Sequence, residues 1–421
     1  MKIAIIGAGI AGNVVARQLY RHHDITVYEA GDHVGGHSHT HVVEQEGRRY
    51  DVDTGFIVFN DRNYPLFGKL LAKLGVATRQ SSMSFSVRAE ASGLEYNGTD
   101  LNGLFAQRRN LLRPSFLGML RDIARFNRVA PRLLEVRGGE LPLGEFLSQG
   151  RYGRAFVDYY LIPMGAAIWS TDPASMLEFP ARFFVRFLHN HGMLRIENRP
   201  VWRTVAGGSA RYVEKLVAPF RHRIRLRAPV ESIRRVTGGA FVKARGCEAV
   251  RYDAAFLACH SDQALALLAD PTPAERAVLG AIPYRRNEAV LHTDERLLPR
   301  SRRAWASWNY HVLAEPGTPV ALTYNMNMLQ GLDAPRAFLV TLNRGAAIDP
   351  ERVIKRMSYD HPLFTPAAVA AQARHAELNR GATFYCGAYW RNGFHEDGVA
   401  SAHEALRHFR ERASAGARVA A

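Results

Sequence analysis

The stretch KIAIIGAGIAGNVVARQLYRHHDITVYEA, residues 2–30, is the strongest indication of the fold. Residues 2–6 form a short apolar run typical of a buried strand, and glycines at positions 7, 9 and 12 open a turn into a helix over 11–21. Residues 25–28 then have the pattern of a second strand. This order predicts a complete strand–helix–strand unit.

The same turn predicts a dinucleotide site. Glycines let bare backbone N–H groups approach a pyrophosphate, whose charge the helix N-terminus stabilises. Glu29 ends the second strand, where a carboxylate accepts hydrogen bonds from a ribose diol and disfavours the 2′-phosphate of NADP. A lone glycine motif can also be a purely structural turn, but here the strand, the helix and the acid accompany it. The predicted contacts are Gly7, Gly9, Ala11, Gly12, Glu29 and Ala30.

A second glycine pair follows the ribose acid within seven residues, in AGDHVGGHSHT (residues 30–40), and VDTGFIVFN (52–60) comes after the next strand. In a simple NAD dehydrogenase another helix would follow instead. Here the chain resembles the FAD-dependent amine-oxidase and phytoene-desaturase superfamily, in which such a segment wraps the cofactor. The resemblance implies FAD and adds contacts from Gly35, Gly36, His37 and Gly55.

Two later segments extend the resemblance to the C-terminal end. LRAPVESIRRV (226–236) places Val230 where the family's backbone meets adenine, and FYCGAYWRNGFHEDGVASAHEAL (384–406) has a strand, a loop and a helix N-terminus. In the family this closing motif meets the flavin, and its helix dipole stabilises negative charge on the reduced ring. Alternatively, the acids of this motif simply complement the dipole of an ordinary helix. The implied contacts are Gly387, Phe394, His395, Glu396, Asp397 and Val399.

One position departs from the family pattern. An arginine commonly follows the glycine pair, whereas this chain has His37, with His39 and His41 beyond it. A histidine can in principle bond covalently to flavin. We expect His37 to be polar lining and the FAD to be held noncovalently.

The predicted fold class is α/β, a two-domain FAD-binding fold of the glutathione-reductase and amine-oxidase type with a Rossmann-like βαβ domain. Because the implied cofactor contacts lie at both ends and near 200–235, the FAD-binding domain is expected to be discontinuous, over 1–65, 200–285 and 380–421. The substrate domain would take 66–199, mainly helical, and 286–379. Within the latter, four runs predict an antiparallel sheet: 289–293, 304–310, 320–326 and 338–342.

The chain is strongly basic, with a net charge of +16, which favours anionic surfaces. Residues 115–136 predict an amphipathic helix that Pro131 should kink or interrupt. Its arginines recur at spacings of four, three and four and are either a solvated face or a contact with an anionic membrane. No nucleic-acid-binding motif accompanies the charge, so no nucleic acid is expected as a partner. The stripe comprises Arg121, Arg125, Arg128 and Arg132.

The expected location is the cytoplasm, peripheral on the inner membrane face if the arginine stripe binds lipid. Cys247, Cys259 and Cys386 have neither disulfide nor metal-ligand spacing, so no metal site is predicted. No segment reaches the roughly 20 apolar residues of a membrane span.

In the resembling family, an antiparallel sheet forms one wall of the substrate cavity. Segments 159–170 and 179–194 are rich in large apolar groups, which are either ordinary core or part of a long apolar pocket. Paired amides are hard to bury without partners, which favours a site. The candidate pocket residues are Trp169, Trp308, Asn309, Tyr324 and Asn325.

The absence of a lysine in one region bears on the class of reaction. Amine oxidases of the superfamily usually hold a lysine near the flavin, but Asn287 and Glu288 stand in that region and no lysine occurs between 244 and 354. This disfavours an ordinary amine oxidase and favours a desaturase-like or isomerase-like enzyme. The candidate catalytic bases are His292, Tyr310 and Glu288, each with a structural role as the alternative.

A narrower resemblance suggests the substrate. YEAGDHVGGHSHT, VDTGFIVFN, AVLHTDERLLP, WASWNY and GFHEDGVAS resemble a bacterial flavoprotein group similar to the N-terminal flavin-binding part of plant cyclopropane-fatty-acid synthases. The resemblance implies an FAD-dependent oxidoreductase that desaturates or oxidises a fatty acyl chain of a membrane lipid. The alternatives are a flavin oxidase of a soluble amine or amino acid, and a non-catalytic flavoprotein partner of a lipid-modifying enzyme.

Overall fold

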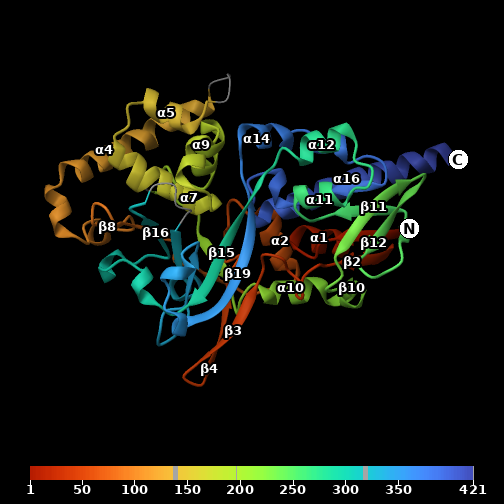
Figure 1. Ribbon diagram of the computed structural model, residues 1–421, viewed down its shortest axis with the longest axis horizontal. Coiled ribbons are helices and arrows are strands. Elements are labelled where there is room, and N and C mark those ends of the chain that lie inside the picture. Colours follow the sequence, from red (N-terminus) through yellow and green to blue (C-terminus); the bar gives the residue numbers. More distant parts are fainter. Residues whose placement is uncertain (136–140, 196, 316–320, 421) are drawn as a thin grey trace.

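The computed structural model describes residues 1–135, 141–195, 197–315 and 321–420, with side chains up to 414. Val136 and Val320, which the sequence predicts to end a helix and to begin a strand, lie outside the described residues. Two lobes lie side by side, and both chain ends lie in the same lobe (Figure 1). Within the described ranges, no helix is long and apolar enough to cross a membrane.

The lobe that holds both termini is built on a five-stranded sheet in which every pairing is parallel. Residues from three distant parts of the chain supply it. Across the sheet the strands are β10 (Ile224–Arg225), β2 (Asp24–Tyr28), β1 (Lys2–Ile6), β14 (Ala254–Leu257) and β20 (Thr383–Tyr385).

Alternation along β1 explains how both faces of this sheet are covered. Successive strand side chains point to opposite faces. Ile3 and Ile5 belong to the cluster that holds helices α1, α10 and α16, whereas Ala4 and Ile6 belong to the cluster with the antiparallel strands β11–β13. These elements are α1 (Ile10–Leu19), α10 (Ala210–Val217), α16 (His395–Ala420), β11 (Val230–Val236), β12 (Gly239–Ala244) and β13 (Val250–Tyr252).

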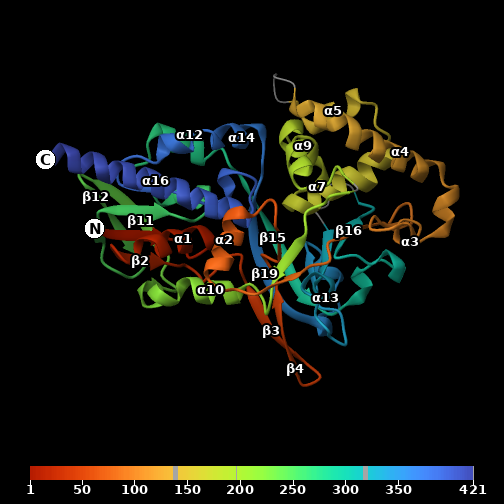
Figure 2. The ribbon, with the colours of Figure 1, turned by 180° about the vertical axis from the view of Figure 1, so that it is seen from behind.

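The second lobe contains a seven-stranded sheet that is antiparallel except where β7 pairs β16. The four runs predicted as strands all contribute to it, and the long strands β15 and β19 lie where the two lobes meet (Figure 2). In sheet order the strands are β19 (Val353–Pro362), β15 (Tyr284–His292), β18 (Leu339–Leu342), β17 (Ala321–Asn325), β16 (Trp308–Val312), β7 (Phe85–Ala89) and β8 (Leu94–Asn97).

Helices complete the second lobe beyond the sheet. Helix α4 (Pro114–Val129) ends seven residues before Val136, the predicted end, because Pro131 lacks an N–H and a 3₁₀ turn over Ala130–Leu134 replaces the helix. Phe116 and Phe126 of α4 are fully buried in an aromatic core with Phe156 and Phe184. The other helices here are α3 (Leu101–Leu104), α5 (Leu143–Gln149), α6 (Arg154–Phe156), α7 (Ile162–Trp169), α8 (Pro173–Leu177) and α9 (Ala181–Asn190).

Smaller elements connect the lobes and cover the sheet ends. They are the hairpin β3 (Thr40–Gln45) and β4 (Arg48–Asp53), the small sheet of β5 (Val58–Asn60), β9 (Trp202–Val205) and β6 (Thr78–Gln80), and the helices α2 (Pro65–Lys73), α11 (Ser261–Leu267), α12 (Pro273–Leu279), α13 (Met326–Gln330), α14 (Pro366–Gln372) and α15 (His375–Leu378).

Candidate active site

A cavity of about 1060 Å³ is lined by residues of both lobes. Its volume is at the upper end of the range for small-molecule sites, so it has room for a large ligand. The predicted cofactor contacts that line it come from four separate parts of the chain. They are Gly7, Gly9, Ala11, Glu29, Ala30, Gly35, Gly36, His37, Gly55, Val230, Gly387, Phe394 and His395.

The first turn contains glycines with different roles. A Cβ on Gly7 would lie 2.7 Å from the Ala258 carbonyl oxygen, and a Cβ on Gly12 only 2.0 Å from the Gly7 oxygen. Gly12 does not line the cavity, which corrects its predicted contact with the cofactor. A glycine is needed there for packing, because any side chain would clash with the Gly7 carbonyl. A Cβ on Gly9 would meet no described atom within 4 Å. Gly9 therefore borders open space on the cavity side of the turn.

Helix α1 begins at this open space. Gly9 is its N-cap, and no side chain caps the helix. Uncapped N–H groups and the helix dipole favour an anion at this point. The first turn of α1 therefore fits a diphosphate.

Glu29 is fixed beside the turn. Its carboxylate accepts hydrogen bonds from the backbone N–H groups of Ala8 and Gly31, each at 2.8 Å. A carboxylate has about four acceptor positions, so capacity remains for ribose hydroxyls. This geometry fits the ribose role that the sequence predicts.

The second glycine pair packs directly against the first turn. The Gly35 N–H donates to the Ala8 carbonyl at 2.9 Å, and a Cβ on Gly36 would lie 3.2 Å from the Gly9 Cα. Both glycines have positive φ angles, +131° and +60°. The two glycine segments thus form one continuous cradle at this end of the cavity.

His395 joins three segments beside the cradle. Its Nε2 lies 2.9 Å from both the Ser38 Oγ and the Tyr212 hydroxyl, and its ring stacks on Phe56 with centroids 3.6 Å apart. Burial lowers the pKa of His395 to about 3. The neutral ring holds the C-terminal motif against the segment that follows the second glycine pair and against α10.

Glu396, Asp397 and Val399 do not line the cavity, which corrects the contacts implied for them. The Glu396 carboxylate accepts from the Leu66 and Phe67 N–H groups, each at 2.9 Å, and so stabilises the N-terminus of α2. Asp397 accepts from the N–H groups of its own preceding loop, and Val399 is buried in the core. Both acids accept hydrogen bonds from backbone N–H groups. This structural role resembles the alternative in which the acids complement a helix dipole.

None of the three candidate catalytic residues reaches the cavity. His292 is fully buried, with Nε2 2.7 Å from the Thr341 Oγ1 and Nδ1 accepting from the Asp294 N–H. Tyr310 is buried in the aromatic core of the second lobe, and Glu288 forms an ion pair with Arg356 at 2.7 Å. For His292 and Glu288 the interpretation was wrong because β15 runs away from the cavity, and of its residues only Tyr284 lines it. On β16 only Trp308 lines the cavity, and Tyr310 lies farther along that strand.

A wall of histidines lines the cavity instead, in which the sequence indicated His37 but neither His260 nor His361. The His37 ring centroid lies 5.5 Å from that of His361 and 6.2 Å from that of His260, and His260 stacks on Tyr284 at 4.5 Å. Burial lowers the pKa of His361 to about 4, so its ring is neutral at neutral pH. Each histidine comes from a different part of the chain, so no local pattern could have identified the wall.

Asn287 orients His361. The Asn287 Nδ2 lies 3.3 Å from the His361 Nδ1, and the Asn287 Oδ1 accepts from the Asn343 Nδ2 at 2.7 Å. The residue in the region where the family usually has a lysine is therefore part of the support for a cavity histidine. His37, in contrast, has a buried Nε2 with no hydrogen-bond partner among the described residues, which suits a polar group of a bound ligand.

Three of the five predicted pocket residues line the cavity: Trp169, Trp308 and Tyr324. Trp308 and Tyr324 are partners across β16 and β17 and so share a face. Asn309 and Asn325 follow them in sequence and point away because side chains alternate along a strand.

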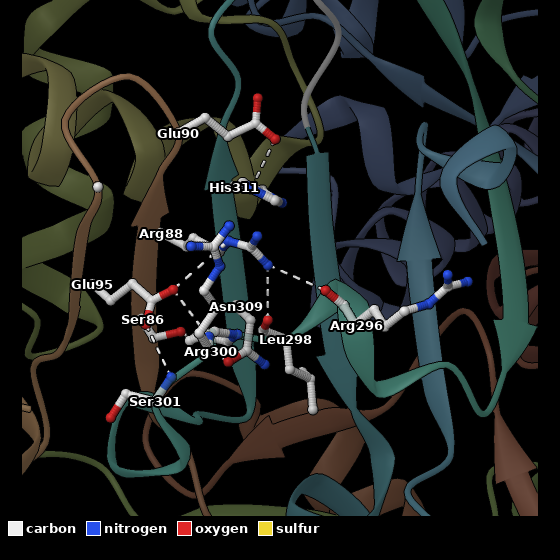
Figure 3. Close-up of polar contacts among 12 residues, drawn as sticks. Ser86, Arg88, Glu90, Glu95, Arg296, Leu298, Arg300, Ser301, Asn309 and His311 are labelled. Carbon is white, nitrogen blue, oxygen red and sulfur yellow. Dashed lines mark hydrogen bonds and ion pairs between the residues drawn. The ribbon is translucent and has the colours of Figure 1, made fainter. Parts of the chain in front are cut away.

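Both amides instead satisfy the backbone, which corrects their assignment to the pocket. The Asn309 Oδ1 accepts from the Ser86 Oγ at 2.8 Å, a contact visible in Figure 3, while its Nδ2 donates to the Ala306 carbonyl. Asn325 accepts from the Met328 N–H and caps α13.

Buried histidines give the fold a predicted pH dependence. Burial lowers the pKa of six of them to about 3 or 4, against about 6.5 in the unfolded chain. The unfolded state therefore binds more protons as the pH falls below about 6.5, and the free energy of unfolding decreases. Burial raises the pKa of Asp53 and Asp397 to about 6, which opposes this trend but involves fewer groups. The histidines are His39, His191, His292, His311, His361 and His395.

We expect the urea midpoint, measured at a fixed FAD concentration, to be lower at pH 5 than at pH 7.5. A midpoint that is equal or higher at pH 5 would contradict the neutral state of these rings.

Comparisons with known proteins agree with this geometry. The family model described as flavin containing amine oxidoreductase matches residues 10–302. Among curated proteins, tryptophan 2-monooxygenase of Pseudomonas savastanoi is 37% identical over 79 residues, which is 18% of this chain. The match spans only 14% of that enzyme.

Several solved structures share the whole fold. A putative protoporphyrinogen oxidase from Exiguobacterium has a TM-score of 0.71 at 16% identity, covering 98% of this chain and 99% of its own. Cyclohexylamine oxidase from Brevibacterium oxydans also gives 0.71, at 15% identity, covering 97% and 99%. A CLA-producing fatty acid isomerase from P. acnes gives 0.65 at 18% identity, covering 96% and 98%. At these identities the likeness concerns the fold.

The α/β fold, the FAD cofactor and the superfamily expected from the sequence are thus confirmed. The cavity supplies what FAD requires at one end, namely an uncapped helix N-terminus, open space beside Gly9 and a fixed ribose acid. The chain belongs to the flavin containing amine oxidoreductase family and is an FAD-dependent oxidoreductase of the amine-oxidase type.

Proposed function

We propose that this enzyme desaturates or otherwise oxidises a fatty acyl chain of a membrane lipid. When bound, FAD supplies a hydride acceptor for such a reaction. The observation that carries the proposal is the apolar lining of the cavity away from the cofactor cradle. That part is lined by Met83, Phe85, Met164, Ile168, Trp169, Phe187, Met193 and Trp308.

Charged groups are sparse along this cavity. Apart from histidines, the charged side chains among the described lining residues are Glu29, Arg199 and Asp360, and none is a lysine. Glu29 belongs to the cofactor cradle. An acyl chain gains free energy from burial against such a surface, at roughly 0.8 kcal/mol per CH₂ group.

Arg199 suits the polar end of a lipid. It is exposed and lines the cavity. Burial raises the pKa of the nearby Tyr160 phenol to about 12, and the positive charge of Arg199 opposes this rise. A guanidinium binds phosphate and carboxylate oxygens well. Arg199 would therefore hold a headgroup phosphate or a free carboxylate while the acyl chain lies inside.

The contribution of this chain's own residues to catalysis would be proton transfer. Desaturation removes a hydride from one carbon and a proton from its neighbour as the double bond forms. We assign the proton acceptor to His361, because its ring is neutral and lines the cavity. The Asn287 Nδ2 lies 3.3 Å from the His361 Nδ1 and favours the tautomer with the hydrogen on Nε2, so Nδ1 would take the proton as the contact with Asn287 gives way.

One observation favours a second candidate, a flavin oxidase of a soluble amine. Asp360 is a carboxylate that lines the cavity beside His361, and it could pair with a substrate ammonium. The matches to cyclohexylamine oxidase and to part of tryptophan 2-monooxygenase support this candidate. The third candidate function is that of a non-catalytic flavoprotein partner of a lipid-modifying enzyme.

The test is anaerobic mixing of the purified enzyme with dispersed phospholipids or with simple amines, followed by the flavin absorbance. We expect phospholipids to bleach the flavin and amines to leave it oxidised. Mass spectrometry should then find acyl chains lighter by two hydrogens in cells that express the protein. Bleaching by amines alone would replace the proposal with the amine oxidase. No bleaching by either, together with a stable complex with a lipid-modifying enzyme, would support the third candidate.

A further inference from the structure

Exposed leucines gather at one end of the molecule. Leu101, Leu111, Leu112 and Leu117 are 74%, 49%, 87% and 45% exposed. They make up four of the eleven large apolar side chains that are exposed in the described part of the chain, yet they fall within 17 residues. Such a concentration is unusual for scattered surface residues and marks an interaction surface.

These residues lie on α3, on a 3₁₀ turn over Arg108–Leu112 and on α4, at the end of the molecule farthest from the C-terminus (Figures 1 and 2). On α4, Leu117, Arg121 and Arg128 are exposed and share one face, at spacings of four and seven. Phe116 and Phe126 occupy the buried face. One face of α4 therefore presents leucine and arginine together.

The charge of this segment is one-sided. Residues 101–134 contain seven arginines and a single acid, Asp122. Asp122 is buried, lies 3.2 Å from Arg125 and accepts from the Gly153 N–H. Exposed acids flank the segment at Asp100 and Glu135, but within it the exposed charges are all arginines, so the segment keeps an excess of positive charge that attracts anions.

Arg125 does not belong to the exposed stripe, which corrects the four-arginine pattern read from the sequence. Its guanidinium donates to the Gly150 carbonyl at 2.7 Å and lies 4.0 Å from the Tyr152 ring centroid. We call the remaining set the leucine–arginine surface: Leu101, Leu111, Leu112, Leu117, Arg108, Arg109, Arg121, Arg128 and Arg132.

The cavity reaches the protein surface close in sequence to Leu101. Tyr96, Gly98 and Thr99 line the cavity, and Gly98 and Thr99 are exposed. Leu101 follows Thr99 by two residues. A ligand that enters the cavity at Gly98 and Thr99 would therefore pass directly from the leucine–arginine surface into the cavity.

We propose that the leucine–arginine surface docks on a bilayer of anionic phospholipid. The leucines enter the boundary between headgroups and acyl chains, while the arginines contact headgroup phosphates. Docking brings the cavity opening to the lipid, so an acyl chain reaches the site without crossing water. This last point rests on the proposed function, whereas the docking itself rests on the exposed leucines and the excess of positive charge.

The test is co-sedimentation of the FAD-loaded enzyme with vesicles of equimolar phosphatidylcholine and phosphatidylglycerol. We expect the double variant Leu111→Ser, Leu112→Ser to bind at least about tenfold more weakly than the unchanged enzyme. The variant Arg121→Gln, Arg128→Gln should lose affinity for these vesicles but not for pure phosphatidylcholine. Leu226→Ser, an exposed leucine in the other lobe, is the matched control and should bind like the unchanged enzyme.

Two further measurements separate the possible failures. If the unchanged enzyme does not sediment, or the leucine variant sediments equally well, the docking proposal is wrong. Flavin bleaching by detergent-dispersed phospholipid can still succeed in that case, so the proposed function is judged separately. If the unchanged enzyme is a dimer in analytical ultracentrifugation without vesicles and the leucine variant is a monomer, the surface is an interface between two copies, which also overturns docking.

Discussion

Replacing Gly9 by valine should give a folded protein that has lost FAD. A Cβ at Gly9 meets no described atom within 4 Å, and the backbone there has φ −73° and ψ −176°, which valine adopts easily. The open space is where the diphosphate must approach the N-terminus of α1. We expect the dissociation constant for FAD to rise at least about 100-fold, which is roughly 3 kcal/mol, while the thermal midpoint of the apoprotein stays close to that of the unchanged chain.

Two other glycines serve as controls for this variant. In Gly12→Ala the new Cβ would lie 2.0 Å from the Gly7 carbonyl oxygen, so we expect loss of the fold itself. Gly118→Val places a side chain in open space on α4, far from the cradle in sequence, and should keep both the fold and FAD. Flavin absorbance after gel filtration and thermal melting distinguish the three outcomes. Normal FAD binding by the Gly9 variant would place the diphosphate elsewhere.

Replacing His361 by glutamine should slow flavin reduction by substrate at least about 100-fold, the lower end of the usual contribution of a general base. Glutamine keeps a polar side chain but cannot accept the proton. Because the predicted FAD contacts do not include His361, the flavin content should be unchanged. The measurement is stopped-flow flavin bleaching under anaerobic conditions with the dispersed lipid.

The matched control is Glu288→Gln, since Glu288 lies outside the cavity and pairs with Arg356. Its rate should equal that of the unchanged enzyme. The pH profile gives a second readout, because the unchanged enzyme should lose activity as the base becomes protonated, whereas the residual rate of His361→Gln should lack that dependence. A variant that reduces its flavin at the full rate would exclude His361 as the base.

The cofactor cradle was predictable because its parts are local. The turn at Gly7, the helix after it and Glu29 form one short stretch, and the close packing of Gly35 and Gly36 on Gly9 follows from glycines that leave no side chain between the two segments. The break of the helix near Pro131 was equally local, because the ring removes a donor wherever it stands.

The errors arose where partners are distant in sequence. Glu396 accepts from the N–H of Leu66, 330 residues earlier in α2, which no motif at the C-terminal end could reveal. His361 and His260 approach His37 only after the long strands and the parallel sheet have formed. Asn309 was misplaced because the sequence reveals the alternation of a strand but not which of its faces meets the cavity.

The flavin content of the purified protein tests whether one FAD lies noncovalently in the cavity that both lobes line. We predict a yellow protein with one FAD per chain, all of it released into the supernatant when the protein is precipitated with acid. A colourless protein that takes up no added FAD would contradict this binding, and a yellow pellet would contradict its noncovalent nature.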